Sequence, residues 1–184
     1  AVDRLTVDYA DRGWLGRDVR AVAEASLGLR AGETLGIVGE SGSGKTVMSL
    51  AMIGLLAESA KITGSISFNG VNLLELDDNA MSKYRGKDIA MVFQDPLSAL
   101  NPVHRVGDQI VEAILLHGHR WSDGGRKLTR KEARDITVGL FRDVGISMPE
   151  QRLDSYSWQL SGGLRQRAMI AMALSCKPRL LIAD

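Results

Sequence analysis

Short stretches of alternating hydrophobic and polar residues dominate the first part of the chain. Residues 4–10 (RLTVDYA) alternate in this way, and residues 19–33 predict a second strand that closes in a turn at Gly32. Residues 34–38 (TLGIV) are continuously apolar, which is typical of a strand buried on both faces. A further strand, residues 61–70 (KITGSISFNG), ends in an Asn-Gly turn. We therefore expect an antiparallel β subdomain near the N-terminus.

Apolar residues recur at helical spacing in residues 45–57, directly after a glycine-rich stretch. Residues 78–84 predict a short polar helix, and residues 89–93 (IAMVF) predict another buried strand. Strand character returns only at residues 179–184 (RLLIAD), after the helix that follows Ser161. These elements predict an α/β core.

Residues 94–159, which lie between these strands, have a different character. A proline-punctuated loop leads into an amphipathic helix over residues 106–119. A polar linker, residues 120–127, joins it to a second amphipathic helix, residues 129–145, which a glycine caps. We interpret this block as a helical insertion between the strands of the core.

Composition and charge restrict the classes of function. The 184 residues include 23 Lys and Arg against 22 Asp and Glu, so the net charge of +1 gives no basic field, and nucleic acid is disfavoured as the main partner. No segment has the roughly 20 apolar residues that span a bilayer, and no signal peptide is recognisable. Any membrane role is therefore expected to come through a partner.

Three further residue types suggest simpler roles. The single Cys176 lies between an apolar helix and an apolar strand, and we expect a buried thiol in a reducing compartment. His117 and His119 have no acidic or Cys partner nearby, so a helix end explains them better than a metal site. The chain begins at Ala1 without Met and stops after an apolar run, so we expect a fragment of a longer protein.

The stretch GESGSGKT, residues 39–46, carries the most specific chemistry. It fits the pattern G-x-x-x-x-G-K-[ST] of the P-loop, in which backbone N–H groups and a helix N-terminus bind phosphates. Lys45 is expected to bridge the β- and γ-phosphates, and the Thr46 hydroxyl to bind Mg²⁺. A Gly/Ser-rich turn that happens to end in Lys-Thr is the alternative. The strand predicted before it and the helix after it favour a nucleoside triphosphate site.

The stretch LSGGLRQR, residues 160–167, opens a second helix of the same kind. Ser161 is a good N-cap, and Gly162 and Gly163 leave bare N–H groups at the helix N-terminus, where anions bind. Taken alone, an ordinary capped helix would explain this pattern. One triphosphate needs only one cradle, however, so two such helix starts favour a composite site between two subunits.

These motifs resemble those of the nucleotide-binding domain of ABC transporters. LSGG followed by Leu164, Arg165 and Gln166 is similar to the signature loop of the peptide and nickel importer branch, and GIVGESGSGKT, MVFQDPLSALNPV and ISFNG are similar to ATP-binding subunits of oligopeptide and dipeptide importers. Trp158 and Leu164 depart from that branch, which usually has His and Met there. The resemblance spans almost the whole chain.

The resemblance implies roles for single residues. Tyr9 would stack on adenine, Gln94 would reach Mg²⁺ and the attacking water and report to a membrane partner, and Asp184 would hold Mg²⁺ through water. The alternatives are an ordinary strand tyrosine, a solvated loop glutamine and a strand-terminal aspartate without a role. The implied catalytic residues are Lys45 and Gln94, the metal residues are Thr46, Gln94 and Asp184, and the nucleotide-binding residues are Tyr9, Gly39, Glu40, Ser41, Gly42, Ser43, Gly44, Lys45, Thr46, Ser161, Gly162 and Gly163.

The resemblance also implies the architecture and activity. It implies one ABC ATP-binding domain over residues 1–184, C-terminally incomplete, with a P-loop NTPase core (1–94 and 159–184) and a helical subdomain (95–158). Such a domain binds ATP and Mg²⁺, and its general base is a glutamate directly after Asp184, beyond this chain. It would be an ATP hydrolase that powers import of peptides or similar solutes.

The expected partners are a second ABC ATP-binding domain, identical or different, and transmembrane permease subunits. A solute-binding protein would act indirectly, and the expected location is the cytoplasmic face of the plasma (inner) membrane. A soluble ABC ATPase acting on DNA or ribosomes is one alternative, although FQDPLSALNP resembles a transporter contact surface. A nucleotide-binding fragment without turnover is the other.

Overall fold

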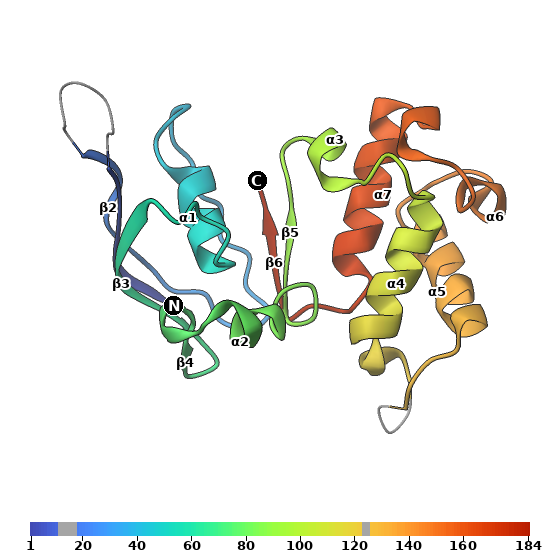
Figure 1. Ribbon diagram of the computed structural model, residues 1–184, viewed down its shortest axis with the longest axis horizontal. Helices are drawn as coiled ribbons and strands as arrows, with labels where there is room; N and C mark the ends of the chain where they lie inside the picture. Colours follow the sequence, from blue (N-terminus) through green and yellow to red (C-terminus); the bar gives the residue numbers. More distant parts are fainter. Residues whose placement is uncertain (11–17, 123–125) are drawn as a thin grey trace. The chain divides into compact units, whose positions relative to one another are not determined.

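The computed structural model describes residues 1–10, 18–122 and 126–184. By its internal contacts the chain forms two compact units, Ala1–Ser82 and Lys83–Asp184 (Figure 1). The predicted division into a core and an insertion at residues 94/95 and 158/159 stays a prediction.

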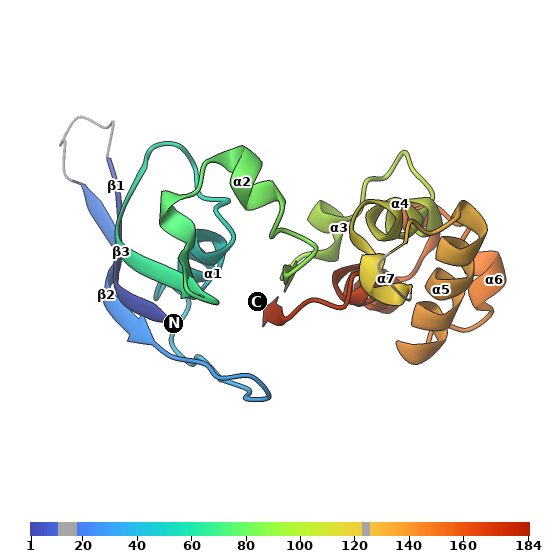
Figure 2. The same ribbon diagram turned by 90° about the horizontal axis from the view of Figure 1, so that it is seen from below.

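An antiparallel sheet organises the first unit. Its strands follow the spatial order β2 (Val19–Leu27), β1 (Val2–Tyr9), β3 (Ala60–Phe68) and β4 (Val71–Asn72). Figure 2 shows β1, β2 and β3 side by side. The strand predicted at residues 4–10 is confirmed as β1, but burial does not alternate along it, because Leu5, Thr6 and Val7 are all buried. The predicted Asn-Gly turn is also confirmed, because Asn69 and Gly70 both have positive φ, 50° and 83°, as a type I′ hairpin requires.

The helices of the first unit are short. They are α1 (Lys45–Met52), the 3₁₀ turn η1 (Leu73–Glu75) and α2 (Asp78–Ser82). The predicted helix over residues 45–57 was too long, because the chain leaves the helix after Met52 and Gly54 takes a left-handed φ of 63°. Met48 and Ala51 form the buried side of α1.

The strand predicted at residues 34–38 is wrong. The stretch lies outside every strand, and its side chains are exposed, with Val38 at 98% and Leu35 at 45% of their full accessible surface. A strand is stabilised by hydrogen bonds to a neighbouring strand. No other segment among the described residues pairs with this one, and an apolar sequence cannot supply that partner by itself.

A parallel strand pair and a helical bundle build the second unit. β5 (Ile89–Val92) pairs with β6 (Leu180–Ala183), from Ile89 opposite Leu180 to Val92 opposite Ala183. Both strands were predicted. The helical elements are α3 (Pro96–Ala99), α4 (Val106–His117), η2 (His119–Trp121), α5 (Arg130–Asp143), α6 (Pro149–Arg152), η4 (Ser157–Gln159) and α7 (Gly162–Leu174).

The two predicted amphipathic helices are α4 and α5, and α7 packs against both (Figure 1). Local sequence explains their ends. Thr129 and Glu132 form a capping box at the start of α5, and Gly145 follows its end at a φ of 74°. α4 ends at His117 with Gly118 as C-cap, which confirms a helix end there. The buried core of the bundle contains Leu100, Val106, Ile110, Val111, Ile114, Ala133, Leu140, Phe141, Ile146, Leu153, Leu160, Ala168 and Ala171.

The middle of the predicted linker 120–127 lies outside the described residues. In the described parts of the chain, no helix combines the length and apolar character that crossing a membrane requires. Cys176 is buried as expected, at 1% exposure, and burial raises the pKa of its thiol.

Candidate functional site

The P-loop folds back on its own lysine. The Lys45 ammonium (Nζ) donates hydrogen bonds to the carbonyl oxygens of Gly39 at 2.8 Å and Glu40 at 2.7 Å, and to Ser43 Oγ at 3.3 Å. The Ser43 N–H closes the turn by donating to the Glu40 carbonyl at 3.2 Å. Residues 39–43 are exposed. The Lys45 ammonium group is therefore positively charged, and the hydrogen-bond acceptors around it are neutral oxygens.

Gly44 fixes the base of the loop. Its φ is 91°, a left-handed conformation that favours glycine. A Cβ at this position would collide with the backbone carbonyl of Ala21 in β2 and would lie 3.2 Å from Val22 Cγ2. Only glycine lets the loop pass so close to β2, so the N-cap of α1 requires this residue type.

The P-loop ends at the N-terminus of α1, as predicted. Gly44 is the N-cap, Lys45 is the first helical residue, and the Met48 N–H donates to the Gly44 carbonyl at 2.9 Å. Thr46, in the first turn, is exposed. Because a helix N-terminus carries partial positive charge, this end of α1 favours an anion.

Tyr9 is the last residue of β1, where it pairs with Val19 of β2 and Ala60 of β3. Its side chain is half-buried. Stacking of Tyr9 on adenine stays a prediction.

In the second unit, the structure brings Gln94 and Asp184 to one edge of the strand pair. The Asp184 N–H donates to the Val92 carbonyl at 3.0 Å, directly after the last paired residues. Gln94 follows Val92 by two positions, and both Gln94 and Asp184 are exposed. Gln94 and Asp184 therefore both follow the carboxyl end of a parallel strand pair.

The signature helix α7 begins as predicted. Ser161 is its N-cap, and the Ser161 Oγ accepts the Leu164 N–H at 3.4 Å. No other part of the described chain lies within 4 Å of where a Cβ at Gly162 or Gly163 would be. The N-terminus of α7 is therefore open. Trp158, three residues before the cap, is 63% exposed and stacks on Tyr156 with ring centroids 5.8 Å apart.

The sequence did not predict a set of contacts at the amino-terminal ends of β5 and β6. We call these contacts, made by Arg120 and Trp121, the Arg120 bracket. The Arg120 guanidinium pairs with the Asp88 carboxylate and donates to the carbonyls of Lys87 at 2.8 Å and Lys177 at 2.9 Å. The Trp121 indole donates to the Ser175 carbonyl at 2.6 Å, and the Lys177 ammonium lies 3.7 Å from the centre of its ring. These contacts fasten η2 to the residues that precede both strands. The only signal was an Arg-Trp pair in an otherwise polar linker.

Solved structures of similar fold define the class. The dimeric structure of MJ0796, a bacterial ABC transporter cassette, matches with a TM-score of 0.83 and 26% identity, over 100% of this chain and 72% of that chain. The dimeric post-hydrolysis state of the same cassette, bound to ADP and Pi, matches with the same values. The fold is therefore that of an ABC-type ATPase cassette.

The model of the family described as ABC transporter matches residues 22–184, and the chain belongs to this family. The Oligopeptide transport ATP-binding protein OppD of Escherichia coli (strain K12) is 46% identical over 167 residues, which cover 91% of this chain and 47% of that protein. The Dipeptide transport ATP-binding protein DppD of Haemophilus influenzae is 46% identical over 184 residues, 100% of this chain and 52% of that protein. The chain thus spans about half the length of these curated relatives, and its resemblance to peptide importer subunits is confirmed.

Proposed function

We propose that this protein is the ATP-binding and ATP-hydrolysing subunit of an ABC importer for peptides or similar small solutes. The observation that carries the proposal is the P-loop, whose Lys45 ammonium is held by the Gly39 and Glu40 carbonyls at the start of α1. The relatives support the solute class, since their names describe oligopeptide and dipeptide transport.

The chemistry of the loop follows from its charges. When ATP binds, Lys45 exchanges neutral carbonyl oxygens for anionic β- and γ-phosphate oxygens, and hydrogen bonds to charged acceptors are the stronger kind. Backbone N–H groups would add further donors to the phosphates. They belong to the first turn of α1 and to Gly39, Glu40, Ser41, Gly42, Ser43 and Gly44. This arrangement stabilises charge on the transferring phosphoryl group, which is the main task in phosphoryl transfer.

The donor chemistry of the proposed metal residues suits Mg²⁺. Thr46, Gln94 and Asp184 offer hydroxyl, amide and carboxylate oxygens, the hard donors that Mg²⁺ prefers. Among the described residues no three His, Cys, Asp or Glu side chains form a metal cluster, and Mg²⁺ in such sites is commonly held by few protein groups together with substrate phosphates. When bound, Mg²⁺ neutralises phosphate charge. Thr46, Gln94 and Asp184 would hold it, and Gln94 would also orient the attacking water.

A second ABC ATP-binding domain would complete the site. The N-terminus of α7 at Ser161, Gly162 and Gly163 is open, and the P-loop already supplies the donors for one triphosphate. The signature loop of one domain would therefore close over ATP on the other, and Tyr9 would stack on the adenine. Transmembrane permease subunits would hold the pair at the cytoplasmic face of the membrane, with a solute-binding protein as an indirect partner.

The test uses the purified full-length protein and cells that lack its gene. We expect Mg²⁺-dependent release of phosphate from ATP, and we expect uptake of labelled di- or oligopeptides to be lost in the cells and restored by the wild-type gene. A protein that neither binds nor hydrolyses ATP would overturn the ATPase assignment. If the purified protein hydrolyses ATP but the deleted strain takes up peptides normally, only the solute class is overturned.

A further inference from the structure

Two segments of the second unit are connected through backbone hydrogen bonds of the first residues of α4. We name residues 94–105 the glutamine segment and residues 153–161 the signature segment. Directly after the glutamine segment, the Val106 N–H donates to the Ser155 carbonyl and the Gly107 N–H to the Leu153 carbonyl, both at 2.9 Å. A Cβ at Gly107 would lie 2.6 Å from the Leu153 carbonyl oxygen, so glycine permits this close approach.

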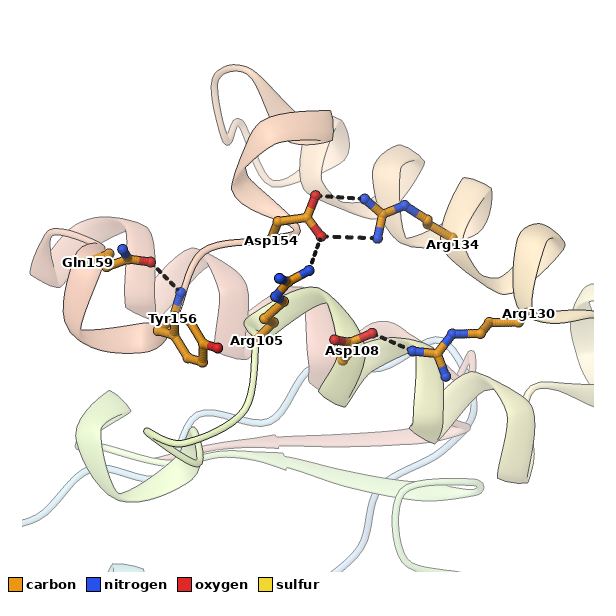
Figure 3. A network of polar contacts seen from close by, with 7 residues as sticks. All are labelled: Arg105, Asp108, Arg130, Arg134, Asp154, Tyr156 and Gln159. Atoms are coloured by element: carbon orange, nitrogen blue, oxygen red, sulfur yellow. Dashed lines mark hydrogen bonds and ion pairs between the residues drawn. The ribbon is translucent and has the colours of Figure 1, made fainter.

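The Asp154 carboxylate adds a side-chain link at the same place (Figure 3). Its Oδ1 pairs with Arg105 Nη1 at 3.2 Å and its Oδ2 with Arg134 Nη2 at 2.9 Å. Arg134 and Arg105 lower the pKa of Asp154, and hydrogen bonding to Tyr156 together with the Asp154 charge raises the pKa of Arg105. Arg105 is the N-cap of α4 and Arg134 lies in α5, so one carboxylate joins three parts of the bundle.

Each segment is also fixed to its own helix. Gln109 of α4 donates to the carbonyls of Asn101 at 3.0 Å and His104 at 3.1 Å, which holds the end of the glutamine segment. Arg165 of α7 donates to the Ser157 carbonyl at 2.7 Å, which holds the signature segment. The contacts around Asp154 connect these two local networks.

We propose that Asp154 is a positioning residue that, through Arg105, makes the glutamine segment and the signature segment move together. A displacement that begins at Gln94 is then passed to Ser161. The inference rests on the proposed function, because it takes the roles of Gln94 and Ser161 from there.

Hydrogen exchange of the nucleotide-free, full-length protein tests the link directly. Arg105→Gln removes the positive charge, and we expect amides of residues 153–161 to exchange about two- to fivefold faster, the size of effect that an exposed ion pair supports. Arg105→Lys keeps the charge and should restore most of the protection. Arg130→Gln is the matched control, because Arg130 pairs with Asp108 at 2.6 Å outside both segments (Figure 3). Unchanged exchange of residues 153–161 in Arg105→Gln overturns the inference.

Dimerisation with a non-hydrolysable ATP analogue tests the consequence. We expect Arg105→Gln to weaken dimerisation about two- to fivefold while the monomer's affinity for the analogue stays at the wild-type value. Equal losses in both measurements would indicate a general loss of stability and overturn the inference. A wild-type protein that does not dimerise would overturn the composite site of the proposed function, and the exchange measurement would then decide the inference by itself.

Discussion

The backbone N–H of Asp184 donates a hydrogen bond to the carbonyl of Val92 at 3.0 Å. This bond continues the parallel register of β5 and β6 past their last pair, Val92 and Ala183. The residues that follow both strands therefore leave the sheet at one edge, and Gln94 and Asp184 are among them. Ligands of open α/β sheets bind at this carboxyl end of the strands. The geometry thus agrees with a shared role for these two residues.

Lys45→Ala should abolish productive ATP turnover in the full-length protein, with a loss of at least about 100-fold, as for removal of one key charge-stabilising donor. The alanine cannot bridge the β- and γ-phosphates. Phosphate release and nucleotide affinity are the measurements. Lys61→Ala is the matched control, because Lys61 also lies in the first unit but pairs with Asp18 at 3.6 Å. Turnover of Lys45→Ala at the Lys61→Ala rate would refute the P-loop assignment.

Tyr9→Ala should weaken ATP binding by about 1–3 kcal/mol if the ring stacks on adenine. Tyr9→Phe and Tyr9→Trp keep an aromatic face and should bind ATP nearly as the wild type does. Nucleotide titration measures the affinity, and thermal unfolding shows whether β1 tolerates each change. Wild-type affinity in Tyr9→Ala would return Tyr9 to the role of an ordinary strand residue.

Arg120→Met should destabilise the protein by about 1–3 kcal/mol, because it leaves the largely buried Asp88 carboxylate and the Lys87 and Lys177 carbonyls without their donor. Urea unfolding measures the loss. Arg130→Met breaks the exposed pair with Asp108 and should cost no more than about 0.5 kcal/mol. Similar losses in the free energy of unfolding for the two variants would show that the Arg120 bracket stabilises the fold no more than an exposed ion pair does.

The capping box of α5 should lose its electrostatic contribution only in strong acid. Arg126, followed by the backbone and hydroxyl of Thr129, lowers the pKa of Glu132 from 4.5 to about 2. Because the folded pKa is the lower one, ionised Glu132 stabilises the fold fully above about pH 4.5, and this stabilisation disappears as the pH falls through 2.

Glu132→Gln keeps the hydrogen-bonding shape without the charge, so it serves as the comparison. The difference in the free energy of unfolding between wild type and Glu132→Gln should be constant above about pH 4.5 and should shrink towards pH 2. A titration of the Glu132 carboxyl by NMR with a midpoint near 4.5 would contradict the prediction.

Features that depend on neighbouring residues could be predicted from the sequence. The P-loop before α1, the cap of α7 at Ser161 and the amphipathic helices α4 and α5 follow from local turn chemistry and periodicity. The placement of Gln94 and Asp184 at one edge was reachable as well, because each follows a short apolar strand.

Features that depend on distant partners could not be predicted. The stretch at residues 34–38 is apolar enough for a buried strand, but strand formation requires a pairing segment that the local sequence does not reveal. The Arg120 bracket joins residues that are 32 to 57 positions apart in the chain. The periodicity of apolar residues reports only local structure and does not reveal such contacts, so residues 120–127 resembled a plain polar linker.

Ser161→Arg tests whether the signature loop acts on ATP bound by the opposite domain. The N-terminus of α7 is open, so an arginine side chain would occupy the space in which a second domain's γ-phosphate would lie. ATP then acts as a switch only if it binds the closed dimer better than the open one, and ADP does not. We expect nearly wild-type nucleotide binding by the monomer and strongly reduced ATP-dependent dimerisation.

Light scattering with a non-hydrolysable ATP analogue and with ADP measures dimerisation in the full-length protein, and nucleotide titration measures monomer binding. Ser161→Ala is the control, because it loses the hydrogen bond to the Leu164 N–H, at a cost of about 1 kcal/mol in helix stability, without adding bulk or charge. It should therefore still dimerise. If Ser161→Arg dimerises normally, or loses monomer binding in step with dimerisation, the composite site is wrong and Ser161 is only a helix cap.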